Sequence, residues 1–155
     1  MKKNQKGFSL IELLIVVAII LIIAAIAIPN LLRSRMAANE ASAVGSIRSV
    51  NTAAVTYSST YPSVGYPSSL AVLGPATAAT SATSDLIDSV LASGTKSGYV
   101  FVLTPGTGTP LTGYSVTGNA VAQNTSGTRG FYSDQSGVIR YNSVNGATSS
   151  SSPLQ

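Results

Sequence analysis

Apolar positions are distributed unevenly along this chain. They are continuous over residues 13–28, and from Phe8 onward only Ser9 and Glu12 interrupt the run. A helix of roughly 20 apolar residues is long enough to cross a hydrocarbon core about 30 Å thick. The stretch 8–28 is therefore predicted to be a transmembrane helix.

The pattern then changes from a continuous apolar run to a periodic one. Apolar residues recur at steps of three and four, and Ile47 and Tyr57 belong to this stripe. Polar residues such as Glu40 and Ser46 occupy positions that we assign to the opposite, exposed side of the helix. The two patterns together predict one long helix over residues 8–57, apolar all round at first and amphipathic afterwards.

The second half of the chain has the patterns of turns and strands. Residues 62–84 are rich in proline, glycine and small polar residues, and residues 85–92 predict a short helix with Ser84 or Asp85 as its N-cap. Four β-branched or aromatic runs predict strands at residues 98–104, 114–121, 129–133 and 138–141. The predicted fold class is α+β, with three or four antiparallel strands packed on the amphipathic half of the long helix.

These elements suggest a domain organisation. Residues 58–146 are expected to form a globular head, and residues 147–155 a flexible tail because they are rich in serine. Residues 1–7 precede the apolar helix and carry three lysines. A basic start next to an apolar stretch is typical of a targeting segment, but here the small residue Gly7 lies before the apolar stretch instead of after it. Cleavage after Gly7 would leave the helix in the mature protein.

Composition excludes several kinds of chemistry. The chain has no cysteine and no histidine, so it has no disulfide, no thiol nucleophile and no imidazole base or metal ligand. Its formal charge is +4, of which the lysines of residues 1–7 supply most, and its other basic residues form no stripe. Net charge is therefore no argument for nucleic acid as a partner. We predict no cofactor, no metal site and no enzymatic activity.

Glu12 is the residue in the apolar span that most needs an explanation. An ionisable side chain in a transmembrane segment costs a few kcal/mol or more, and by default it marks a functional site. A carboxylate in such a setting needs a cationic partner. If the chain is cut after Gly7, the new amine at Phe8 lies one helical turn from Glu12. The amine could come from a neighbouring copy or from the same chain, or the carboxylate could snorkel to the membrane surface.

Two short stretches carry a resemblance to a known family. The run GFSLIELLIVVAII at residues 7–20 and the run AAIAIP at residues 24–29 resemble the N-terminal signature of type IV pilins and of type II secretion pseudopilins. The resemblance implies that prepilin peptidase cuts between Gly7 and Phe8 and that Phe8 is then N-methylated. It also implies that Glu12 pairs with the Phe8 amine of a neighbouring subunit during assembly, and it matches the helix proline at Pro29.

The resemblance further implies a function and a location. The chain would be a structural subunit of a type IV pilus filament, a helical homopolymer that serves adhesion, motility or DNA uptake. It would lie in the inner membrane as a single-pass protein, meet an assembly platform and minor pilins there, and then enter a cell-surface filament. One alternative is a pseudopilin of a type II secretion system in the periplasm. Another is a single-pass, membrane-anchored periplasmic binding domain that never polymerises.

Overall fold

The computed structural model describes residues 8–154. Its helices are α1 (Leu10–Thr60), α2 (Leu70–Leu73) and α3 (Ser89–Ala92). Its strands are β1 (Thr95–Lys96), β2 (Tyr99–Pro105), β3 (Tyr114–Ala120), β4 (Gly130–Asp134), β5 (Arg140–Asn142) and β6 (Ser152–Pro153). The chain divides into two compact units, one ending at Ser34 and the other beginning at Arg35, and α1 contributes to both.

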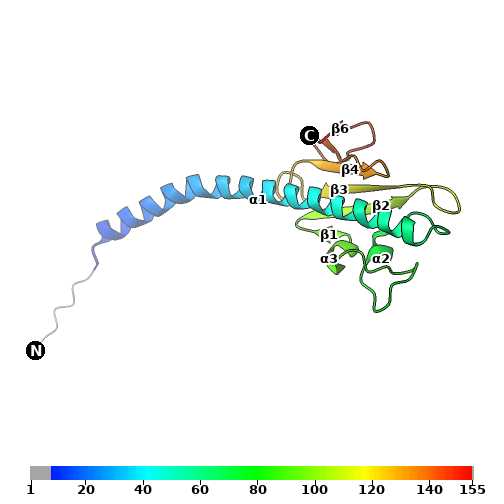
Figure 1. Ribbon diagram of the computed structural model, residues 1–155. Coiled ribbons are helices and arrows are strands. Elements are labelled where there is room, and N and C mark those ends of the chain that lie inside the picture. Colours follow the sequence, from blue (N-terminus) through cyan, green and yellow to red (C-terminus); the bar gives the residue numbers. More distant parts are fainter. Residues whose placement is uncertain (1–7, 155) are drawn as a thin grey trace, which may run out of the picture. The chain divides into compact units, whose positions relative to one another are not determined.

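The second unit is a two-layer α+β head. The part of α1 that belongs to it lies across one face of the sheet, as Figure 1 shows. The sheet is antiparallel, and its strands follow one another in the order β1-β2-β3-β4-β5-β6. Side chains alternate between the two faces of each long strand, so every second residue of β2 and β3 is buried under α1.

The core of the head joins the periodic stripe of α1 to the inner face of the sheet. Its largest fully buried apolar side chains are Ile47, Val50, Tyr57, Leu73, Leu91, Tyr99, Val116 and Phe131. The short helices α2 and α3 each contribute one of them. This arrangement confirms the predicted α+β class and the packing of the amphipathic helix on an antiparallel sheet.

The number of strands is a correction to the prediction. Within residues 8–154 the sheet has six strands and not three or four. The four predicted runs correspond to β2, β3, β4 and β5, whereas β1 and β6 were not predicted. Each of these two is only two residues long. Such strands form through backbone pairing to a longer neighbour, and two residues are too few to show an alternating pattern.

The C-terminal segment, expected from its composition to be a flexible tail, forms hydrogen bonds with the sheet. The pair Ser152–Pro153 forms β6 on β5, and the backbone N–H of Leu154 donates to the carbonyl of Ile139 at 2.7 Å. The Arg140 guanidinium donates to the carbonyl of Ser151 at 3.0 Å. Serine-rich composition does not reveal these bonds because the segment contributes backbone groups to them.

The observed helix boundaries differ slightly from the predicted ones. The long helix continues to Thr60 instead of ending at Tyr57. The short helix α3 is capped by Asp88, whose side chain accepts from the N–H of Leu91, and not by Ser84 or Asp85. Asp85 has a φ of 53°, in the left-handed region that a helix cannot include, so the helix begins after it.

Candidate functional site

The first site predicted from the sequence lies at the start of α1. Ser9 precedes the first helical residue, and its backbone N–H donates to Glu12 Oε2 at 2.8 Å. A glutamate three residues after the N-cap that accepts from the N-cap amide is one half of a capping box. Glu12 thus closes the first turn of its own helix. Phe8 is 84% exposed, and Gly7 lies outside the described residues.

The surface of α1 around Glu12 is apolar on all sides. Its large apolar side chains from Leu10 to Ile28 are between 46% and 78% exposed. The helix is long and apolar enough to cross a membrane, and none of its most apolar window is buried within the chain. Water around so many apolar groups would be strongly unfavourable, because each fully buried side chain of this kind is worth about 1.5–3 kcal/mol. This segment needs an apolar environment that the chain does not supply.

Pro29 lies inside α1, which continues through it without interruption. Proline removes one main-chain hydrogen bond from a helix and clashes with the preceding turn. It is 17 residues from Glu12, so the two are roughly 25 Å apart along a helix. The structure does not bring Pro29 close to Phe8 or Glu12, and the assembly roles of these residues remain predictions.

A second carboxylate on α1, Glu40, has a different environment from the one we predicted. It is 6% exposed and lies against the loop before β4. Its Oε1 accepts from the Thr128 N–H at 2.8 Å, from the Thr128 hydroxyl at 2.7 Å and from the Arg129 N–H at 3.1 Å. Its Oε2 accepts from Arg129 Nε at 2.7 Å. Assigning Glu40 to the exposed face of the helix was wrong, because Thr128 and Arg129 provide the partners that a buried carboxylate requires.

The charge state of Glu40 follows from these contacts. Burial by itself would raise the pKa of Glu40, but the hydrogen bonds from Thr128 and Arg129 outweigh burial and lower this pKa from 4.5 to about 2. The hydroxyl of buried Tyr99 donates to the carbonyl of Arg129 at 2.9 Å. Burial and the nearby charge of Glu40 raise the pKa of Tyr99 to about 12, so the hydroxyl stays protonated and remains a donor.

Arg129 is held in place from several directions. Its guanidinium carbon lies 5.7 Å from the ring centres of both Phe131 and Tyr141, which is within the range of cation–π attraction. No sequence pattern indicates this cluster, since Glu40 and Arg129 are 89 positions apart. A buried polar residue in a helix can be recognised only when its distant partner is known.

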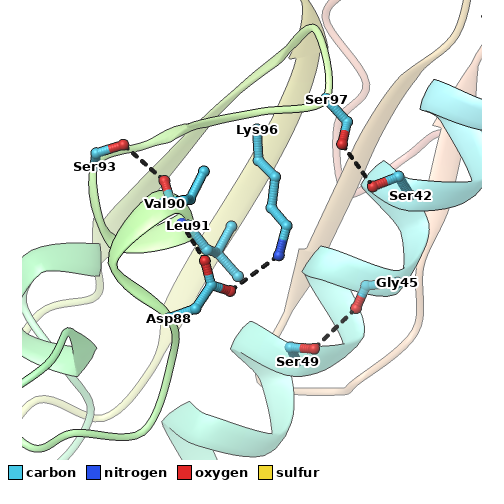
Figure 2. A network of polar contacts seen from close by, with 9 residues as sticks. All are labelled: Ser42, Gly45, Ser49, Asp88, Val90, Leu91, Ser93, Lys96 and Ser97. Atoms are coloured by element: carbon cyan, nitrogen blue, oxygen red, sulfur yellow. Dashed lines mark hydrogen bonds and ion pairs between the residues drawn. The ribbon is translucent and has the colours of Figure 1, made fainter.

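Further polar bonds join α1 to the head on either side of Glu40. Asn39 Nδ2 donates to the carbonyl of Ser126 at 2.8 Å. Ser42 bonds the hydroxyl of Ser97 at 3.0 Å, and Figure 2 shows this contact between α1 and the turn after β1. Ser46 is also buried, at 5% exposed, contrary to its predicted place on the exposed side. About two consecutive turns of α1, over residues 39–46, therefore face the head through polar as well as apolar groups.

The ion pair of Lys96 with Asp88 is more exposed. Lys96 Nζ lies 2.9 Å from Asp88 Oδ2, and the two side chains are 33% and 50% exposed. Figure 2 shows Lys96 reaching from β1 to the N-cap of α3. The hydrogen bond from Lys96 lowers the pKa of Asp88. Because water screens such an exposed pair, it contributes little to stability.

Among residues 8–154, no three acidic side chains gather where a metal ion could bind, and the chain contains neither histidine nor cysteine. The polar groups of the head described above bond to one another. The arrangement is suited to binding, because it presents a large apolar helix surface with one carboxylate and a separately folded head.

Comparisons with known proteins agree with the resemblance drawn from the sequence. Residues 2–28 match the family described as the prokaryotic N-terminal methylation motif. The chain is also 66% identical over 38 residues to the type IV wide pilus major component PilA4 of Thermus thermophilus. That match covers 24% of this chain and 29% of the relative, so it spans less than a third of either protein. No solved structure matches the chain. The N-terminal segment thus matches this motif and is similar to that of a type IV pilin.

Proposed function

We propose that this chain is the structural subunit of a type IV pilus and polymerises through the N-terminal part of α1. The observation that carries the proposal is the apolar, unburied surface of residues 10–28 in a segment that matches the N-terminal methylation motif. The head has its own core, so it can fold while that segment lies in a membrane or in a filament.

Processing would come first. Prepilin peptidase would cut between Gly7 and Phe8, and the new Phe8 amine would be N-methylated. Phe8 is exposed and lies two residues before the first helical residue, Leu10, so Phe8 itself is accessible to an enzyme. Cleavage would place a cation within one turn of the Glu12 carboxylate.

Assembly would then move the helix from one apolar environment to another. Lipid tails are about as apolar as leucine side chains, so transfer from a bilayer to a bundle of identical helices changes the hydrophobic free energy little. Transfer to water would instead expose the whole apolar surface. Copies packed head to tail by a rotation that does not close would generate a helical filament.

Glu12 would specify how neighbouring copies are placed along the axis. A carboxylate has about four acceptor positions, and in this structure the Ser9 N–H uses one of them. The Phe8 amine of a neighbouring copy can use the others. A charged group at the centre of an apolar environment costs about 2.5–3.5 kcal/mol by insertion scales, and this cost falls when the charge is paired. The pairing would favour one axial stagger over its alternatives.

The subunit would lie in the inner membrane before assembly, in contact with prepilin peptidase, an assembly platform and minor pilins. After assembly the heads would form the outer surface of a cell-surface filament and would determine adhesion, motility or DNA uptake.

The test is to shear surface fibres from cells, image them by electron microscopy and identify their peptides. We expect fibres that contain this chain, with methylated Phe8 as the N-terminal residue in the intact mass. A chain that stays in the membrane fraction without fibres would support an anchored binding domain. Loss of secreted enzymes on deletion, with no surface fibres in the parent strain, would support a type II secretion pseudopilin.

A further inference from the structure

The loop between β5 and β6 contains the dipeptide Asn145–Gly146, which reaches back to β3. In an Asn–Gly pair the glycine amide nitrogen can attack the asparagine side chain, because glycine has no side chain to hinder the approach. We propose that Asn145 is a latent deamidation site and that Asn119, on β3, suppresses its reaction.

The Asn145 side chain bonds to the backbone of β3 at a position where a neighbouring strand would otherwise pair. The pairing of β3 with β4 ends at Gly118↔Phe131. Two residues further along, the Ala120 N–H donates to Asn145 Oδ1 at 2.9 Å, and Asn145 Nδ2 donates to the Ala120 carbonyl at 3.0 Å. The amide therefore pairs with Ala120 as a backbone peptide would, and both bonds restrict rotation of the side chain.

The attacking nitrogen is held as well. The Gly146 N–H donates to Asn119 Oδ1 at 2.8 Å. Attack on the Asn145 side chain requires this N–H to leave its acceptor and the backbone to rotate. Gly146 has a φ of 89° and is exposed, and no atom lies within 4 Å of where its Cβ would be. The side of Gly146 on which a Cβ would project is therefore open.

The close approach of this loop depends on a glycine in β4. A Cβ on Gly130 would lie 2.9 Å from Asn145 Cα and 3.0 Å from Asn119 Oδ1. The Gly130 N–H also donates to the Val144 carbonyl at 3.0 Å. The loop is thus seated directly on the backbone of β4, beside the side chain of Asn119.

The reaction itself needs only water. The Gly146 nitrogen loses its proton and bonds to Cγ of Asn145, the bond from Cγ to Nδ2 breaks, and ammonia leaves with the proton. Water then opens the cyclic imide at either carbonyl and gives aspartate or isoaspartate. The product carboxylate has no N–H, so it cannot donate to the Ala120 carbonyl. Deamidation would therefore detach this loop from β3.

The test compares two substitutions at Asn119 in the full-length chain. Asn119→Leu removes the acceptor at similar volume, whereas Asn119→Asp keeps an oxygen that can accept from Gly146. Peptide mass spectrometry would follow aspartate and isoaspartate at residue 145 during incubation in mildly alkaline buffer. Since one hydrogen bond is worth roughly 1 kcal/mol, we expect about a fivefold faster reaction in Asn119→Leu and a rate near that of the parent chain in Asn119→Asp. Equal rates in Asn119→Leu and the parent chain would overturn the proposal.

A second measurement does not depend on the folding of a variant. The parent chain is incubated in urea and in native buffer, and deamidation at Asn145 is compared with that at Asn124, which is exposed. We expect unfolding to accelerate the reaction at Asn145 more than at Asn124. An Asn145 rate that is the same in the folded and unfolded chains would show that the structure does not protect it.

Discussion

Glu40 offers the sharpest test of how the head is attached to α1. Glu40→Gln keeps the size and shape of the side chain but replaces one carboxylate oxygen by an NH₂ group. The Thr128 and Arg129 groups around it are all donors, so the new NH₂ would face donors and leave part of the cluster without an acceptor. We expect this single change to destabilise the head.

The magnitude and its pH dependence follow from the pKa of Glu40. This pKa falls from 4.5 in the unfolded chain to about 2 in the fold, and a factor of ten in an equilibrium constant is about 1.4 kcal/mol, so the ionised carboxylate stabilises the head by about 3 kcal/mol. A lowered pKa means that this stabilisation is complete above pH 4.5 and is lost as pH falls toward 2. Glutamine does not titrate. The free energy of unfolding of the parent chain should therefore exceed that of Glu40→Gln by about 3 kcal/mol at pH 7, and this difference should nearly vanish at pH 2.

The assay is urea unfolding of the full-length chain in detergent, followed by near-ultraviolet circular dichroism of the head tyrosines. The pKa of Asp88 is also lowered, by the hydrogen bond from Lys96. The pKa of Asp134 is lowered as well, although burial by itself would raise it. Both residues remain in the variant, so the difference between the two chains isolates Glu40. A gap that stays constant from pH 7 to pH 2 would refute the electrostatic reasoning, and a gap below about 1 kcal/mol at pH 7 would refute the buried cluster.

Three further changes test other parts of the molecule. Glu12→Ala should abolish or greatly reduce filaments while the head still folds, and normal filaments on electron microscopy would contradict the assembly role. Ile47→Ala removes a fully buried side chain and should lower the free energy of unfolding by about 2–5 kcal/mol in the same urea assay. Lys96→Ala, at an exposed ion pair, should change the free energy of unfolding by less than about 1 kcal/mol and serves as the surface control.

Much of the fold could be predicted from the sequence because its longest elements have strong periodic patterns. The stripe of α1 that includes Ile47 and Tyr57 is buried as predicted, and the four predicted strands all form. The strands β1 and β6 could not be found in the same way. They are defined by hydrogen bonds to β2 and β5, and a two-residue strand has no pattern of its own.

The polar part of the head was not predictable for a related reason. Hydrophobic periodicity assigns each helix residue to a face by its own polarity, and on that basis Glu40 belonged on the exposed side. The loop that binds it is far away in the sequence and consists of Thr128 and Arg129, neither of which is distinctive. Burial of a charge is decided by such partners, and a single sequence does not say which residues will meet.

The two glutamates of α1 show what this distinction means for function. Glu40 accepts four hydrogen bonds from its own chain, and the one from Arg129 Nε is also an ion pair, so Glu40 is satisfied within a single chain. Glu12 accepts one backbone N–H and is surrounded by exposed apolar side chains. One neutral donor offsets only a small part of the cost of placing a carboxylate in an apolar environment, whereas a neighbouring cation offsets most of it. The contrast favours a partner for Glu12 from outside the subunit, and the Phe8 amine of a neighbouring copy is the cation that processing would supply.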